Sequence, residues 1–261
     1  MIATSGRVTA LLVGIPFVLA AAGWGAFSMV GQFSQTSEHH EASYAWNGGE
    51  ISLHASAGYV HVVTGGGSQV AVSYTEHYQL KRPTVTATTA DGGVQLNAKC
   101  PSGIFANNCE INYTLTVPAS AQLVLHTGDG HVSVADVTGA LSLDVGNGGI
   151  SLDNVSGDIV AHTGDGGVGA TRLRSTSVQA STGNGGVHLE WIVAPKNATV
   201  QTGDGGIGLT VPQRTGPYAV SATTGNGGTQ VDVPNDPSSS SKISAHTGNG
   251  GIQIAFAGGS S

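Results

Sequence analysis

The sequence predicts an all-β solenoid, and three observations carry this prediction: a glycine turn that recurs seven times, alternation of apolar and polar residues after each turn, and a shortage of large side chains. Of the 261 residues, 41 are glycine and only 5% are aromatic. The hydrophobic fraction is nevertheless 39%, mostly valine, alanine, leucine and isoleucine. Such a chain can fill a thin core layer by layer, but not a broad and thick one.

The repeated turns read TGDGHV, VGNGGI, TGDGGV, TGNGGV, TGDGGI, TGNGGT and TGNGGI. They follow one another at intervals of 18, 18, 19, 20, 22 and 23 residues, which suits one solenoid coil and is too short for a βαβ unit. Glycine is favoured because the chain reverses there through positive φ angles. The first glycines of the turns form a predicted turn ladder: Gly128, Gly146, Gly164, Gly183, Gly203, Gly225 and Gly248.

Each turn is followed by a short alternating segment, such as Val132, Ser133 and Val134 after the first one. A period of two residues indicates a strand with one buried and one exposed face. Stacked coils place such strands about 4.8 Å apart and gather like residues into columns. Residues 41–120 alternate less regularly, and we expect them to form the first coils and an N-terminal cap. We expect the last strand, GIQIAFA, to close the other end.

An uncharged apolar segment precedes the repeats. Val8 to Val30 would form a helix of about 35 Å, long enough to span a bilayer. Arg7 precedes the segment and acidic residues follow it, so the remainder of the chain is expected outside the cytoplasm. A single-pass anchor in the cell membrane and secretion after signal-peptide cleavage near Ala20–Ala22 both remain open. The expected organisation is a cytoplasmic N-terminus (1–7), a transmembrane anchor or signal segment (8–30), a linker (31–44), the solenoid (45–257) and a tail (258–261).

Two cysteines, Cys100 and Cys109, lie beyond this segment, in a compartment where disulfides persist. We expect them to be joined and to clamp a local hairpin. For so short a loop, chain entropy gives a stabilisation of about 3 kcal/mol.

The passages INYTLTVPASAQLVLHTGDGHVSV and VTGALSLDVGNGGISLDNVSGDIVAHTGDGG resemble the bacterial putative-adhesin domain of unknown function, which is related to toast-rack and auto-transporter-adhesin head domains. The resemblance covers residues 45–257. It implies a right-handed, single-stranded β-helix at the cell envelope, with a role in adhesion or envelope-stress sensing. It supplies no catalytic residues.

The third residue of the first six turns alternates between aspartate and asparagine, from Asp129 and Asn147 onwards, and the seventh turn has Asn249. This alternation separates like charges in adjacent coils. Calcium is not expected, because isolated carboxylates fall short of the six to eight oxygens that it prefers and the nine-residue repeat of calcium-binding β-rolls is absent. His126 and His162 are two coils apart, about 9–10 Å, which is too far to share a zinc ion. His246 likewise precedes a turn, and we interpret all three as solvent-facing residues.

A column of turn threonines beginning at Thr127 raises a further alternative, binding to ice or a crystal surface. The column is broken by Val145, and turn threonines commonly bond to the local backbone.

No cofactor or metal is expected. The formal charge of −7 opposes a nucleic-acid partner. An enzyme on such a fold would need carboxylates and a base converging in a groove. The candidates follow no recognised motif: Glu76, His77, Asp153, Asp158, Arg172, Arg174 and Glu190.

We therefore expect a non-enzymatic cell-envelope surface or interaction protein, and the alternative is a secreted polysaccharide-active β-helix enzyme. Besides the membrane, the expected partner is an anionic envelope polymer or another envelope protein. Four basic residues fall 8 to 13 positions after their turn glycines and should share the edge opposite the turns, where loops often bind partners: Arg172, Arg174, Lys196 and Arg214.

Overall fold

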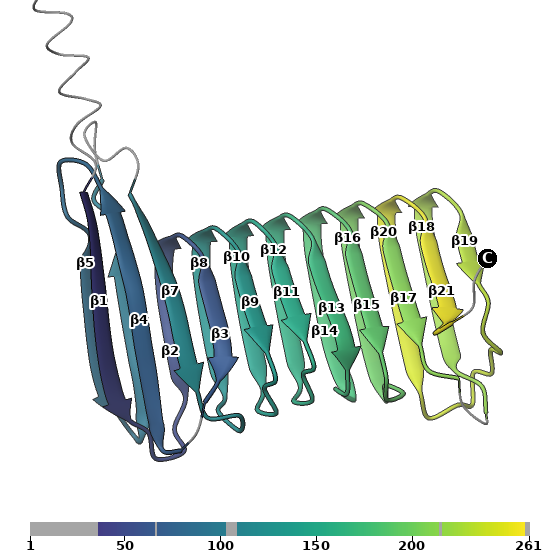
Figure 1. Ribbon diagram of the computed structural model, residues 1–261. Coiled ribbons are helices and arrows are strands. Elements are labelled where there is room, and N and C mark those ends of the chain that lie inside the picture. Colours follow the sequence, from purple (N-terminus) through teal and green to yellow (C-terminus); the bar gives the residue numbers. More distant parts are fainter. Residues whose placement is uncertain (1–35, 66, 103–108, 214–215, 259–261) are drawn as a thin grey trace, which may run out of the picture.

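The computed structural model describes residues 36–65, 67–102, 109–213 and 216–258. These residues form two large β-sheets that lie face to face and contain no helix. Figure 1 shows the strands as the rungs of a long ladder, with β1, β4 and β5 at one end and the C-terminus at the other. The all-β solenoid predicted from the repeats is confirmed.

Sheet A has eleven strands, in the spatial order β1 (Thr36–Ala45), β4 (Gln69–Tyr78), β7 (Glu110–Val117), β3 (Val60–Thr64), β9 (Val132–Ala135), β11 (Ile150–Asp153), β13 (Val168–Leu173), β15 (Val187–Trp191), β17 (Ile207–Val211), β21 (Ile252–Phe256) and β19 (Thr229–Val231). Sheet B has ten, in the order β18 (Ala219–Asn226), β20 (Lys242–Asn249), β16 (Asn197–Asp204), β14 (Ser177–Asn184), β12 (Ile159–Asp165), β10 (Leu141–Asn147), β8 (Leu123–Asp129), β2 (Ile51–Ala57), β6 (Gly93–Lys99) and β5 (Thr84–Ala90).

One regular coil consists of a strand in sheet B, a glycine turn, a strand in sheet A and a loop back to sheet B. Strands of successive coils pair in parallel and in register, so that Leu141 pairs with both Leu123 and Ile159. The glycine turns therefore form one edge of the solenoid, the turn edge, and the returning loops form the opposite edge, the loop edge.

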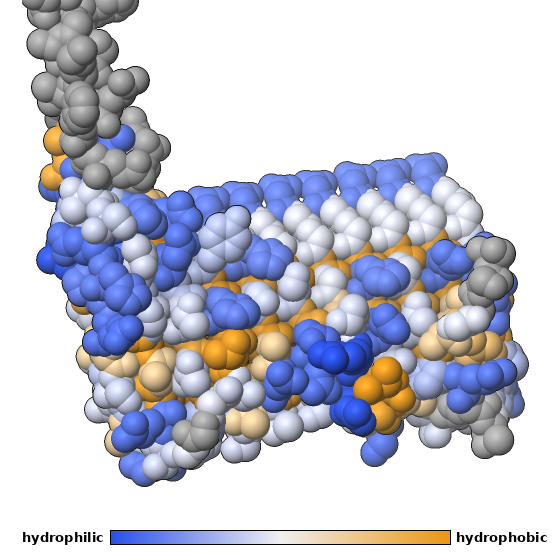
Figure 2. Space-filling view, viewed as in Figure 1, coloured by the Kyte–Doolittle hydropathy of each residue, from blue (hydrophilic) through white to orange (hydrophobic). Residues whose placement is uncertain are grey.

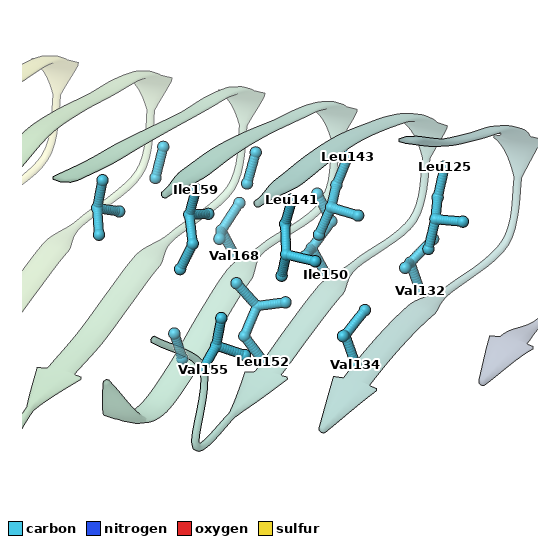
Figure 3. Close-up of a cluster of buried hydrophobic side chains, with 14 of the residues drawn as sticks. Leu125, Val132, Val134, Leu141, Leu143, Ile150, Leu152, Val155, Ile159 and Val168 are labelled. Atoms are coloured by element: carbon cyan, nitrogen blue, oxygen red, sulfur yellow. The ribbon is translucent and has the colours of Figure 1, made fainter. Parts of the chain in front are cut away.

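The core lies between the two sheets and is filled by the alternating apolar residues (Figure 3). Val132 and Leu152 point inward with exposures of 0% and 4%, as the alternation predicts. Leucine, isoleucine and valine at matching positions pack above one another, and this continuous burial of apolar area is the main stabilising contribution.

Glycine is required in the turns for two reasons. At Gly166 the φ angle is +146°, a conformation that other residues rarely adopt. A Cβ atom there would also lie 2.1 Å from the carbonyl oxygen of Gly148 in the preceding coil. Tight stacking of the turns therefore excludes side chains at this position.

The coils do not all stack in the order of the sequence. The last coil, β20–β21, inserts between β16–β17 and β18–β19, because β20 pairs with β16 on one side and with β18 on the other. The expectation that the final strand closes the solenoid is wrong, since β21 is an inner strand and β19 is the edge. Val231 on β19 is 36% exposed, whereas its neighbour Ile254 on β21 is fully buried.

The N-terminal end shows a similar insertion. The coil β2–β3 lies between the coil β6–β7 and the first regular coil, β8–β9. Strands β1, β4 and β5 run antiparallel to their neighbours and cap this end. Strand β1 occupies much of the stretch that we expected to be a linker.

The disulfide between Cys100 and Cys109 is present, with 5.8 Å between the Cα atoms. It does not clamp a hairpin, because β6 and β7 belong to opposite sheets. Instead it joins the two ends of the connection between β6 in sheet B and β7 in sheet A.

The predicted membrane-spanning segment, Val8 to Val30, lies outside the described residues. Within the described ranges, no helix has the length and apolar character needed to cross a membrane.

Candidate interaction surfaces

The turn edge carries a ladder of hydrogen-bonded amides and carboxylates. Asn147 donates from Nδ2 to Oδ1 of Asp129 at 2.7 Å, and Asn184 donates in the same way to Asp165 at 2.6 Å. Further along, Asn249 donates to Asp204. The asparagines thus keep neighbouring carboxylates two coils apart, which removes the repulsion that stacked aspartates would experience.

The threonine column faces the core rather than solvent. Thr163 is fully buried, and its hydroxyl donates to the carbonyl oxygen of Gly148 in the preceding coil at 2.7 Å. One coil further along the chain, Thr182 donates in the same way to the carbonyl oxygen of Gly166 at 2.8 Å. Five of the six threonines of the column are buried and Thr224 is half-buried, so the column does not present a surface to ice or a crystal and that alternative is wrong. The threonines link adjacent turns instead.

A shallow channel follows the outer face of sheet A beside the turn edge. Figure 2 shows a hydrophilic row along this edge with a paler row below it. The channel contains two hollows of about 530 and 650 Å³, both of which include Gly206 and Gly208. One hollow is lined by His131 and His188 and the other by Gln230 and Gln253. Peptide groups and glycine form most of its floor.

The loop edge holds three of the four basic residues expected there, Arg172, Arg174 and Lys196, but they are not a simple positive ridge. Arg172 forms a bidentate ion pair with Asp153, and this pair lowers the pKa of the Asp153 carboxyl and raises the pKa of Arg172. Arg174 lies 3.4 Å from the side-chain oxygen of Asn154. Lys196 is exposed, and Arg214 lies outside the described residues.

Arg172 sits on a strained corner of the backbone. Its φ angle is +54°, and Asp136 and Asn154 adopt similar angles of +62° and +51° in the two preceding coils. Aspartate and asparagine tolerate this conformation better than arginine does. The ion pair with Asp153 on the neighbouring coil offers a reason for arginine at this corner.

A second ionic cluster lies in the N-terminal cap. The guanidinium of Arg82 lies 2.9 Å from Glu76, 2.8 Å from Glu38 and 3.0 Å from the ring of His40. Glu76 is almost completely buried, whereas Arg82 is half exposed. The Tyr78 hydroxyl donates to Glu38 at 2.7 Å. The arginine therefore occupies the centre of a group whose donor atoms would otherwise suit a metal ion.

Two tyrosines continue the cap cluster into the core. His40 stacks on Tyr74 with 4.8 Å between the ring centroids, and Tyr74 packs against Tyr113 at 5.3 Å. Burial is the main cause that raises the pKa of both tyrosines, with nearby Glu76 adding to the effect. The buried Tyr113 hydroxyl has no hydrogen-bond partner among the residues that the structure describes.

The candidate catalytic residues lie on different parts of the solenoid. Glu76 and His77 lie in the cap on β4, and Asp158 lies before β12 on sheet B. Asp153 and Glu190 are both on sheet A but two coils apart. Asp153 is engaged by Arg172, and its lowered pKa is the opposite of what a general acid requires.

The three histidines before turns lie in one column on the outer face of sheet B. Asp144 pairs in register with both His126 and His162, so these two histidines are separated by one coil, as expected. His246 lies further along, beside Gln201 and Thr223.

Sequence reasoning missed one member of this column. His54 on β2 lies directly beside His126, because β2 pairs with β8. The signal was available, since HASAGYV around His54 matches HTGDGHV around His126 at the histidine, the second glycine and the valine. The cap cluster gave no comparable signal, because Glu38, Glu76 and Arg82 come together only through antiparallel pairing.

The parallel coils, the glycine turns and the capped end define a β-solenoid of the toast-rack type. The chain belongs to the Toastrack DUF4097 family, whose model matches residues 29–257. No curated protein matches the sequence.

Solved structures include similar chains. A "putative cell adhesion protein" from Clostridium sporogenes has 15% identity and a TM-score of 0.43, with 85% of this chain and 100% of that chain covered. A "putative adhesin" from Bacteroides fragilis has 12% identity and a TM-score of 0.41, with 83% and 97% covered. A "putative lipid binding protein" from Parabacteroides distasonis has 13% identity and a TM-score of 0.25, with 84% and 96% covered.

Proposed function

We propose that this protein is a non-enzymatic surface module of the cell envelope, which presents its solenoid outside the membrane and binds a partner in adhesion or envelope-stress sensing. The observation that carries the proposal is the placement of polar and charged side chains among the described residues. Repeated ladders and shallow faces dominate, and the candidate catalytic side chains stand apart or are paired with one another.

The proposed location is the outer side of the cell membrane, with the N-terminal segment as a single-pass anchor. The disulfide supports an oxidising compartment, where such bonds persist. Secretion after cleavage of the segment is the alternative. Membrane fractionation of cells expressing the full chain, followed by N-terminal sequencing, distinguishes the two: an anchored protein keeps its first residues.

The loop edge is the surface that we propose for an anionic envelope polymer or an envelope protein. Arg174 and Lys196 are exposed there, and Arg172 becomes available only if it leaves Asp153. The test is binding of the full chain to anionic glycopolymers over a range of salt concentrations. A variant in which these three residues and Arg214 are replaced by glutamine should lose salt-sensitive binding, whereas unchanged binding would refute this assignment.

The cap cluster is the feature most favourable to the enzymatic alternative, because two carboxylates and a base converge there. Glu76 is nearly inaccessible, however, and its carboxylate is held by Arg82. Incubation of the protein with envelope and plant polysaccharides tests the alternative. Product formation that disappears in Glu76→Gln would establish an enzyme and overturn the proposal.

A further inference from the structure

The insertion of coil β2–β3 creates a pair of histidines that the order of the sequence does not suggest. His54 and His126 occupy matching positions on adjacent parallel strands, and their ring centroids are 5.8 Å apart. Both rings are exposed on the outer face of sheet B.

A carboxylate determines which nitrogen of the His126 ring carries the proton. Nδ1 of His126 lies 3.0 Å from Oδ2 of Asp144 on the next coil. Because a carboxylate only accepts hydrogen bonds, Nδ1 carries the proton and Nε2 of the neutral ring keeps a free lone pair. A carboxylate behind a histidine is the usual support of a metal-binding imidazole, since it sets the tautomer and raises the basicity of the ligand atom.

The separation of the rings fits a shared ion. A zinc ion lies about 2.0 Å from a ligating nitrogen and about 3.2 Å from the ring centroid, so two ligands at the tetrahedral angle have centroids about 5.2 Å apart. The observed separation of 5.8 Å is close to this value. His162 is separated from His126 by the Asp144 coil and is engaged with Ser181 at 2.9 Å, so it does not complete the pair.

We propose that His54 and His126 form a binding site for a divalent transition-metal ion such as Zn²⁺, Ni²⁺ or Cu²⁺, with Asp144 as the residue that positions His126. Imidazole nitrogens suit these metals rather than Mg²⁺ or Ca²⁺. Two protein ligands leave coordination positions open to water or to a donor atom from outside the chain. A bound ion would connect the inserted coil β2–β3 to the regular stack.

The experiment is a calorimetric titration of the full-length chain, purified without a histidine tag, with Zn²⁺ and then with Ni²⁺. One equivalent should bind, and His54→Gln and His126→Gln should each abolish this binding. Asp144→Asn should weaken it about 10- to 100-fold, as the loss of a supporting carboxylate does elsewhere. Because all three side chains are exposed, each variant should keep the melting temperature of the metal-free parent.

Two control variants locate the ion. His246→Gln removes a histidine of the same column that stands beside Thr223, and it should leave binding unchanged. His40→Gln removes a ring from the cap cluster, whose centre is taken by Arg82, and should also have no effect. Absence of binding by the parent, loss of binding in His40→Gln, or full binding in His54→Gln would each overturn the proposal.

Discussion

Replacing Thr163 by valine tests whether the buried threonines hold neighbouring turns together. The two side chains have nearly the same shape, so the change removes a hydroxyl without opening a cavity. The carbonyl oxygen of Gly148 then loses the 2.7 Å hydrogen bond that it accepts from Thr163. Leaving a buried carbonyl without its donor costs about 1–2 kcal/mol. In a chain of this size, that corresponds to a fall in melting temperature of about 2–6 °C.

Val145 provides the matched control, because it occupies the same position one coil earlier and is also fully buried. Val145→Thr should be close to neutral, since the new hydroxyl can donate to the turn of the coil before it. Because solenoid stability depends on neighbouring coils, amide hydrogen exchange of the adjacent turns is the more direct assay, with exchange about 5- to 30-fold faster in Thr163→Val. Equal exchange and melting in Thr163→Val and the parent would refute the role assigned to the hydroxyl.

Three other predictions concern the turns, the loop edge and the cap. Gly166→Ala should destabilise the protein by about 3 kcal/mol or more through positive φ and backbone overlap, whereas Gly228→Ala, with nothing within 4 Å of the new atom, should stay within about 0.5 kcal/mol in thermal unfolding. Because the pKa of Asp153 is lowered in the folded state, its stabilisation is present at neutral pH and is lost below about pH 4. Arg172→Asn should therefore raise that pKa in an NMR titration, and the stability difference from the parent should shrink in acid. Arg82→Leu leaves a buried carboxylate unpaired and should cost about 2–4 kcal/mol in denaturant unfolding, so an unchanged midpoint would contradict the role of the cap cluster.

The regular part of the fold was predictable because one local rule repeats. Glycine at the turn and apolar residues at alternate positions after it are sufficient to place Val132 and Leu152 in the core. Periodicity reports the shape of a coil, however, and not which coil is its neighbour. Coils β18–β19 and β20–β21 carry almost the same turn, TGNGG, so either can stack on the preceding coil as far as the pattern shows. In the folded chain the coil β20–β21 takes the inner place, so that Ile254 is buried and Val231 is exposed.

The candidate surfaces were less predictable, because they depend on contacts across coils. The sequence placed Arg172 on the loop edge but did not reveal its pairing with Asp153, which lies 19 residues earlier. The asparagine and aspartate ladder could be anticipated, since its members recur with the repeat. The cap cluster could not, because antiparallel pairing brings Glu38 opposite Glu76 and follows no repeat.

The two insertions affect the two ends of the solenoid differently. At the N-terminal end, the inserted coil β2–β3 places a coil with an irregular turn directly against the regular stack, and the antiparallel strands of the cap cover the next coil. At the other end, insertion of β20–β21 protects its apolar strands and leaves β18–β19 outermost. The outer strand β19 has only three residues and carries Thr229 where the inner strand has Ile252. A short edge strand with fewer apolar residues is a poor template for pairing with another chain. The insertion of β20–β21 therefore buries the longer, more apolar strand β21 and leaves the shorter strand β19 at the edge.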